Sequence, residues 1–317
     1  MSNISKADSI LLTGHTGFLG SHVLEELKQQ GYTNVTGINS KGVNLVSQEA
    51  TKEFFRKYRF KHIIGCHGRT GGIGANSLYP ATFFYDNLMM TTNLLNENSD
   101  LKGKVIIIGT TCSYPAEAPT PFKEEYLLAG GLPEKSNRAY ALAKIMGLVQ
   151  LQAMNKQFGL KYNYLLPANL LGPRDTFDRT RSHAIPAIIS KVGDAMRKGE
   201  KEIVLWGTGT ATREFLDVRE CARGVVLSLE KNESLEPCNL GTGQEHSILS
   251  ITQMICDDMG FEGEIKLDPS KPDGQKRRCL DVSRAKQEFG FESSYPLIRS
   301  IQDTVDYYLR EGRYLCN

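Results

Sequence analysis

The sequence predicts an α/β protein with a doubly wound parallel sheet and a smaller C-terminal α/β substrate domain. Short, almost wholly apolar segments such as residues 105–108 are typical of parallel strands that are covered on both faces. These segments alternate with stretches of helical periodicity such as residues 138–158. The alternation changes near residue 246. We expect the larger domain at 1–168 plus 211–244 and the smaller domain at 169–210 plus 245–317.

The composition excludes several classes of protein. Hydrophobic residues make up 40% and charged residues 23% of the chain, as is usual for globular proteins. The formal net charge of +2 provides no basic field for a nucleic acid or an acidic membrane surface. No apolar run reaches the ~20 residues that span a bilayer, and the polar N-terminus lacks the core of a signal peptide. The cysteines show no CxxC spacing, so we expect reduced thiols in a cytoplasmic protein and no bound metal.

A glycine-rich turn follows the first expected strand. The apolar residues 9–12 run into TGHTGFLG (residues 13–20), and an amphipathic helix follows to about residue 30. Gly14 permits the tight turn, Gly17 lets the backbone approach a pyrophosphate, and Gly20 lets the helix pack close to the strand. The N–H groups at the start of the helix then face the phosphates. A turn without a ligand is the alternative, but the flanking strand and helix favour a Rossmann-type dinucleotide site.

The end of the second expected strand bears on the choice of cofactor. A site for NAD commonly has a carboxylate here that binds the ribose 2′-hydroxyl. This chain has Asn39, Ser40 and Lys41 instead. Because no carboxylate repels a 2′-phosphate and Lys41 can attract one, the sequence favours NADP(H) over NAD(H). A solvated loop lysine is the alternative explanation for Lys41.

Tyr140 and Lys144 lie four residues apart and therefore on one face of the helix expected over 138–158. An unperturbed phenol titrates near pH ~10. A neighbouring ammonium favours the phenolate and lowers the pKa of the phenol. A tyrosine in this setting can exchange a proton with a carbonyl or alcohol oxygen. A chance pair on an ordinary helix is the alternative, so the hypothesis depends on the other motifs.

Further candidates follow the ends of strands, where ligands of open α/β sheets bind. Thr110 can hydrogen-bond a substrate oxygen beside Tyr140, and Cys112 can face the same cavity. Cys112 is either a small buried apolar residue or, near a cation, a reactive thiolate. His183 precedes an apolar-faced helix and becomes a candidate acid if the preceding loop brings it over the cavity. The basic loop 271–278 suits a diphosphate or is a solvated run of charges.

These motifs together resemble the extended short-chain dehydrogenase/reductase family. TGHTGFLG, a hydroxyl residue after the fourth strand and YALAK carry that resemblance. More narrowly, the chain resembles the GDP-L-fucose synthase family. The segments concerned are RTGGIGANSLYPATFFYDNLMM, GTTCSYP, YALAKIMG, PANLLGPRDTFD, SHAIPAII, LWGTGTATREFLDV and PDGQKRRCLDVSR. The resemblance implies NADPH-dependent 3,5-epimerisation and 4-reduction of a GDP-linked 4-keto-6-deoxy sugar.

The resemblance also implies roles for individual residues. Tyr140 gives a proton to oxygen 4, Lys144 lowers the pKa of Tyr140 and holds the nicotinamide ribose, and Thr110 replaces a serine of the family. Cys112 and His183 correspond to the base and the acid of epimerisation. The implied substrate-binding residues are Asn169, Lys191, Trp206, Arg213 and Arg278, with arginine and lysine exchanged at 191 and 278. The implied cofactor-binding residues are Gly14, Thr16, Gly17, Phe18, Leu19, Lys41, Tyr140, Lys144, Pro167, Asn169, Leu170 and His183, and Thr16 stands where relatives can carry an arginine.

Two other functions remain open from the sequence. A nucleotide-sugar 4-reductase or 4-epimerase without 3,5-epimerase activity would keep Tyr140 and Lys144 and leave Cys112 and His183 idle. A non-catalytic NADP-sensing protein on the same fold is the second alternative. The sugar is either a 6-deoxyhexose, a colitose precursor or a 6-deoxyheptose. By resemblance we expect a homodimer formed through the helices at 80–98 and 140–158.

Overall fold

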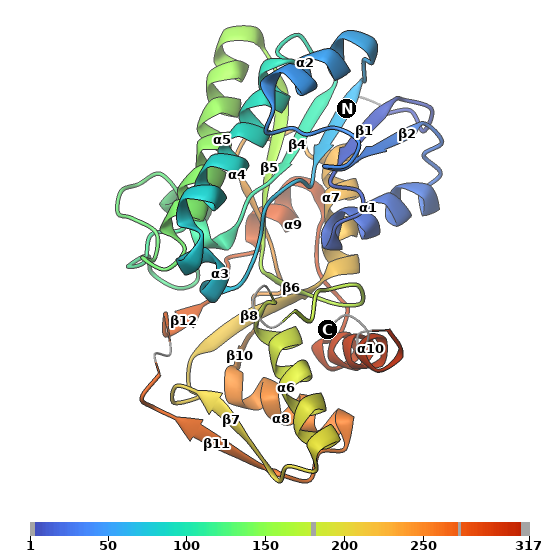
Figure 1. The fold of residues 1–317 in the computed structure, drawn as a ribbon. Helices are drawn as coiled ribbons and strands as arrows, with labels where there is room; N and C mark the ends of the chain where they lie inside the picture. The colour runs from blue at the N-terminus through green and yellow to red at the C-terminus, as the bar shows by residue number, and fades with distance from the viewer. Residues whose placement is uncertain (1–3, 179–181, 272–273, 312–317) are drawn as a thin grey trace.

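The computed structural model describes residues 4–178, 182–271 and 274–311 and contains two units, one above the other in Figure 1. The larger unit is a six-stranded sheet in the order β2-β1-β3-β4-β5-β9, and every neighbouring pair is parallel. The chain therefore runs one way from β1 to β2 and then the other way from β3 onward, so the predicted doubly wound fold is confirmed. The strands are β1 (Ile10–Thr13), β2 (Val35–Ile38), β3 (His62–Gly65), β4 (Lys104–Ile108), β5 (Lys161–Pro167) and β9 (Cys238–Leu240).

Helices cover both faces of this sheet, which explains the apolar character of its strands. All residues of β1, β3 and β4 are buried. α4 (Pro80–Asn96) packs against α5 (Arg138–Phe158) on one side, and α1 (Phe18–Gln29) packs against α7 (Val218–Lys231) on the other (Figure 1). α2 (Gln48–Lys57) lies beside α4, and its start is capped because the Ser47 hydroxyl accepts the Ala50 N–H at 3.3 Å.

The smaller unit has its own sheets and its own hydrophobic core. β8 (Thr212–Asp217) pairs with β6 (Asn169–Leu171), β10 (Glu245–Ser247) and β12 (Arg277–Arg278), and β7 (Glu202–Trp206) pairs with β11 (Glu264–Asp268). α6 (Ala184–Lys198), α8 (Ile248–Met259) and α10 (Leu297–Arg310) enclose its core around the fully buried Phe177. The unit is thus assembled from two separated stretches of the chain. β8 pairs with strands of the smaller unit, although residues 211–244 were expected in the larger domain. The domain boundaries therefore stay a prediction.

The structure adds elements that the sequence did not predict. α3 (Ile73–Leu78) begins inside the glycine-rich segment after β3, and α9 (Ser283–Phe289) packs against β9. Two 3₁₀ turns, η1 (Thr111–Ser113) and η2 (Glu124–Tyr126), lie between β4 and α5. Of these elements, η1 matters most for the site because it carries Cys112.

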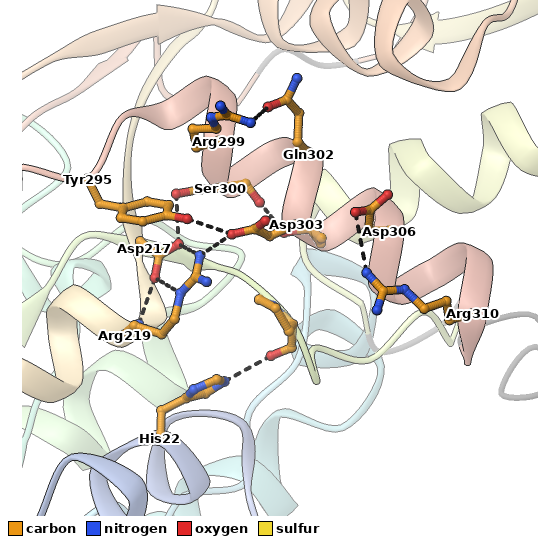
Figure 2. A network of polar contacts seen from close by, with 12 residues as sticks. His22, Asp217, Arg219, Tyr295, Arg299, Ser300, Gln302, Asp303, Asp306 and Arg310 are labelled. Carbon is orange, nitrogen blue, oxygen red and sulfur yellow. Dashed lines mark hydrogen bonds and ion pairs between the residues drawn. The ribbon is translucent and has the colours of Figure 1, made fainter. Parts of the chain in front are cut away.

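A polar network joins the two units (Figure 2). The buried carboxylate of Asp217 caps α7 by accepting the Arg219 N–H at 2.8 Å, and it accepts the Ser300 hydroxyl of α10 at 2.7 Å. The Arg219 guanidinium bridges Asp217 and Asp303, each at 2.7 Å. His22 of α1 contacts the carbonyl oxygen of Pro173 at 3.0 Å, which fixes the chain just after β6.

No helix within the described ranges is long and apolar enough to cross a membrane. The cysteines in these ranges are free thiols, as expected: Cys66, Cys112, Cys221, Cys238, Cys256 and Cys279. Cys316 lies outside the described residues.

Candidate active site

The turn between β1 and α1 leaves no room for side chains. Gly14 has a φ of +70°, and a Cβ there would lie 2.8 Å from the carbonyl oxygen of Cys66. A Cβ on Gly20 would lie 2.1 Å from the carbonyl oxygen of Gly14. Gly17 precedes α1 and provides no capping side chain, so the first N–H groups of the helix stay available to a ligand. A bare backbone at a helix N-terminus fits a dinucleotide pyrophosphate.

The end of β2 carries a neutral side chain that is held in place. The Asn39 side chain donates to the Thr16 hydroxyl at 3.3 Å and accepts the Lys41 and Gly42 N–H groups at 3.1 and 3.2 Å. The Lys41 residue itself is exposed. The end of β2 therefore presents the Asn39 amide, the Thr16 hydroxyl and the Lys41 ammonium. An NAD site commonly has a carboxylate at this place, which would repel a 2′-phosphate.

Thr110, Tyr140 and Lys144 meet where β4 ends beside the first turns of α5. Burial raises the pKa of Tyr140, while a hydrogen bond with the Thr110 hydroxyl acts in the opposite direction. Burial lowers the pKa of Lys144 to about 8. The expected lowering of the Tyr140 pKa by Lys144 is therefore absent in the protein without ligands. Desolvation of the phenolate is the largest cause, and the nearby Cys112 thiol acts in the same direction.

Buried neighbours fix the position of Lys144. The Tyr164 hydroxyl donates to the backbone carbonyl of Lys144 at 2.9 Å. His67, which follows β3, contacts the hydroxyls of Thr13 and Thr91 at 2.8 and 3.1 Å. Burial and then the Lys144 charge lower the pKa of His67 to about 3, so this imidazole is neutral. No local pattern singles out His67, because its contacts are with two threonines from distant elements.

Cys112 lies next to a cation, which is the condition for a reactive thiolate. Its sulfur is 3.5 Å from Nη1 of Arg278 and 3.5 Å from Nδ2 of Asn137. Its backbone N–H donates to the Thr110 hydroxyl at 3.2 Å. Thr110 thus contacts both the Tyr140 phenol and the segment that carries the thiol. Asn137 precedes α5 and would be read from sequence as a capping residue, but its amide turns to Cys112 instead.

Arg278, expected at the sugar nucleotide, is held against this thiol. Nε and Nη2 of Arg278 donate to the side-chain oxygen of Gln275 at 3.2 and 3.1 Å, and Nη2 lies 3.8 Å from Glu134. Its neighbour across β8 and β12 is Arg213, which donates to the backbone oxygen of Gln275 at 2.7 Å. Two guanidinium groups therefore lie side by side, and together they suit a diphosphate.

His183 approaches from the smaller unit. It is the N-cap residue of α6, and its side chain is 46% exposed. A Cβ on Gly72 would lie 2.6 Å from the carbonyl oxygen of Ser182, so the glycine-rich segment after β3 packs against the residue before His183. This packing brings His183 to the carboxyl edge of the large sheet. Surrounding protein atoms lower the pKa of His183 although one side of the ring is open. Its charged neighbour is Asp175, at 4.0 Å from Nδ1.

The remaining predicted residues are spread around the site. The Asn169 amide donates to the Glu214 carbonyl oxygen at 2.8 Å, and Lys191 donates to the Val204 carbonyl oxygen at 2.5 Å. Trp206 is 65% exposed at the end of β7. Pro167 and Leu170 flank Asn169 where the chain passes from β5 to β6. No group of three or more His, Cys, Asp or Glu side chains in the described residues is arranged to hold a metal ion.

Comparisons with known proteins agree with this geometry. Residues 10–241 match the family described as NAD dependent epimerase/dehydratase. The chain is 35% identical over 306 residues to probable GDP-L-fucose synthase 1 of Oryza sativa subsp. japonica, across 96% of this chain and 93% of that protein. It is 32% identical over 305 residues to GDP-L-colitose synthase of Yersinia pseudotuberculosis, across 95% and 98%. A GDP-L-fucose synthetase of Naegleria fowleri solved with bound NADP is similar at a TM-score of 0.89 and 29% identity, across 98% and 95%.

Proposed function

Because the chain belongs to the NAD dependent epimerase/dehydratase family, alongside the GDP-L-fucose synthases, we propose that it converts a GDP-linked 4-keto-6-deoxy sugar by 3,5-epimerisation and 4-reduction with NADPH. The observation that carries this proposal is the position of Thr110. Its hydroxyl contacts the Tyr140 phenol and also the backbone of Cys112, so a proton donor for a ketone and a thiol lie around one point. A simple reductase has no use for a thiol beside a guanidinium at that point.

The cofactor site lies along the turn of Gly14, Gly17 and Gly20 and the loop at Lys41. When bound there, NADPH supplies the hydride for carbon 4. The described residues orient it: the bare N-terminus of α1 binds the pyrophosphate, and Lys144 binds the nicotinamide ribose. Thr16, Phe18, Leu19, Pro167 and Leu170 complete the cofactor site in this proposal.

The epimerisation depends on the ketone at carbon 4, which acidifies the hydrogens on carbons 3 and 5. The Cys112 thiolate removes one of these protons, and the electron pair of the C–H bond becomes an enolate with its charge on oxygen 4. The hydroxyls of Tyr140 and Thr110 hydrogen-bond this oxygen. His183 then returns a proton to the carbon from the opposite face, which inverts the centre. Reduction follows when Tyr140 protonates oxygen 4 as carbon 4 receives the hydride.

The sugar nucleotide extends from this point into the smaller unit. Arg213 and Arg278 suit its diphosphate, and the exposed Trp206 offers a ring for the base. Asn169 and Lys191 complete the proposed substrate site. A GDP-linked 6-deoxyhexose of the fucose type is the favoured substrate, and a colitose-type sugar or a 6-deoxyheptose is the variant of the same chemistry.

The test uses Cys112→Ser with a GDP-4-keto-6-deoxy sugar in deuterium oxide. We expect deuterium incorporation at carbons 3 and 5 to fall by about 100-fold or more, since serine is a far weaker base at neutral pH, while NADPH remains bound. NMR of the product and NADPH absorbance report the two steps. Cys256→Ser, which removes a buried thiol of α8, is the matched control. Incorporation at the wild-type rate in Cys112→Ser would reject Cys112 as the base, whereas no incorporation by the unchanged protein would leave a 4-reductase or a redox-neutral 4-epimerase as the function.

The protein is also proposed to act as a cytoplasmic homodimer. Phe84 and Tyr85 on α4 and Met146 and Val149 on α5 are exposed at 37%, 56%, 37% and 40%. These helices pack together, so the four side chains supply apolar surface to one pair of helices that a second copy could cover. Free thiols at the described cysteines support a reducing compartment. Sedimentation analysis of Tyr85→Glu against the unchanged protein tests the dimer, and an unaltered mass would reject this face.

A further inference from the structure

Asp175 is a buried acid with one unused oxygen. It lies in the loop after β6, and its side chain is only 3% exposed. Its Oδ1 accepts the Thr176 N–H at 2.7 Å, whereas Oδ2 is buried and has no hydrogen-bond partner in the part of the chain that the structure describes. Buried carboxylate oxygens in native proteins are almost always hydrogen-bonded, so an orphan indicates a partner that arrives during function.

The groups around Asp175 point to one partner. Its chain neighbour Arg174 is turned away and pairs with Glu25 of α1 at 2.6 Å. His22 of α1 is engaged with the Pro173 carbonyl oxygen, and Tyr307 of α10 is the other titratable side chain near Arg174. Among the residues that the structure describes, the charged neighbour that faces the carboxylate is His183 at the start of α6, whose Nδ1 is 4.0 Å from Oδ1.

We propose that Asp175 is the positioning residue for His183, accepting a hydrogen bond from Nδ1–H so that Nε2 faces the carbon that is reprotonated during epimerisation. This inference rests on the proposed function and extends it. A shift of the half-exposed ring by about 1 Å brings the pair to hydrogen-bond distance. In the reaction the imidazolium releases its Nε2 proton to the enolate carbon, and Nδ1 keeps its proton for the carboxylate. The neutral ring is therefore left in one tautomer.

The environment of the pair suits this role. Burial lowers the pKa of His183 and raises the pKa of Asp175 to about 7. An isolated buried imidazole would be neutral at neutral pH and would have no proton to give. Asp175 and His183 together retain one proton. When this proton is on the imidazole ring, the two groups form an ion pair. Asp175 thus provides an acceptor that favours the protonated ring over a neutral imidazole without a partner.

The experiment compares Asp175→Asn with the matched control Asp178→Asn, which removes one carboxylate from the same loop. Deuterium incorporation at carbons 3 and 5 should fall by about 10- to 100-fold in Asp175→Asn and stay near the wild-type rate in Asp178→Asn. Hydride transfer is measured separately as NADPH formation from the reduced sugar nucleotide and NADP⁺, and it should change little. Nitrogen-15 NMR of the histidine rings, with His183 assigned through His183→Gln, reports the tautomer and the titration.

The outcomes separate the inference from the proposed function. We expect Asp175→Asn to lower the pKa of His183 further and to abolish the preference for the Nδ1–H tautomer, because the carboxylate that stabilises both is gone. Unchanged titration and tautomer of His183 would overturn the inference, even if turnover fell. If wild-type protein incorporates no deuterium into any GDP-4-keto sugar, the proposed function fails, and the NMR result still decides whether the pair exists.

Discussion

The phenol of Tyr140 and the imidazole of His183 reach the site from different kinds of scaffold. Tyr140 lies in the first turn of α5, which packs on the large sheet, and Lys144 one turn later is buried. His183 begins α6, whose buried face belongs to the core of the smaller unit. In the proposed mechanism, proton transfer at oxygen 4 therefore depends on groups of the larger unit alone. The proposed epimerisation also needs the smaller unit, so we expect it to be the more easily lost of the two activities.

Cys112 stands between the two scaffolds. It follows β4 of the large sheet, yet the cation beside it, Arg278, belongs to β12 of the smaller unit. The comparison therefore predicts that substitutions in the smaller unit weaken epimerisation first and that substitutions in α5 weaken reduction first.

The largest effect is expected from Tyr140→Phe, which removes the proposed proton donor that the larger unit provides. Reduction should slow by about 10²- to 10⁴-fold in kcat, because no other group protonates oxygen 4. Deuterium incorporation at carbons 3 and 5 should fall less, since the Thr110 hydroxyl, Cys112 and His183 remain. NADPH oxidation and NMR measure the two rates. An equal loss in both rates would show that reduction and epimerisation do not depend on separate parts of the site.

Lys144→Met tests the larger unit through the free energy of unfolding. The pKa of Lys144 falls from 10.5 to about 8 on folding, so below pH 8 the native state carries a charge that burial disfavours. Wild-type stability therefore rises as pH increases from 8 to 10.5, where only the unfolded lysine is still protonated. At pH 7 the variant should be more stable by up to about 3 kcal/mol, and less so at pH 10. Urea unfolding checks this, with the exposed Lys156→Met of α5 as control, and a pH-independent difference would contradict it.

Arg278→Gln tests the part of the site that depends on the smaller unit. Loss of the cation beside Cys112 should slow deuterium incorporation by about tenfold, and Arg278→Lys should recover part of it because charge returns without the paired contacts to Gln275. The reverse hydride transfer should be affected less. If instead the KM for the sugar nucleotide rises and both steps keep their rates, Arg278 acts on the diphosphate alone.

The smallest effect is expected from Lys41→Ala, at the outer end of the cofactor site. An exposed lysine contributes up to about 1 kcal/mol to an ion pair, so the KM for NADPH should rise about two- to fivefold. The KM for NADH should not change, since NADH lacks the 2′-phosphate. Steady-state kinetics with both cofactors measure this preference, and a parallel rise in both values would remove Lys41 from the explanation of cofactor choice.

Local patterns were enough to predict the large sheet and most of its helices. Residues 105–108 of β4 are all apolar because both faces of the strand are covered, and the turn at Gly14 is predicted from three glycines at a characteristic spacing. The sequence also placed α5 and α6 at the residues where they are found. These features depend on neighbours within a few residues, which is the information that a single sequence carries.

The parts that could not be predicted depend on residues far apart in the chain. The contact between Arg278 and Cys112 joins positions 166 residues apart, and nothing local to either indicates it. No local pattern marks Asp175 as a site residue, because its burial comes from packing by other elements. The expected direction of the Tyr140 pKa shift was wrong for the same reason, since burial raises this pKa and is set by tertiary structure.

The assembly of the smaller unit from two stretches limits how its sugar preference can be redesigned. β8 comes from the first stretch, and its sheet partners β10 and β12 come from the second. A chimaera that takes only one stretch from a related enzyme would join strands of different parents within one sheet and separate Arg213 from Arg278. Recombination between homologues should therefore yield active hybrids only when both stretches of the smaller unit come from the same parent.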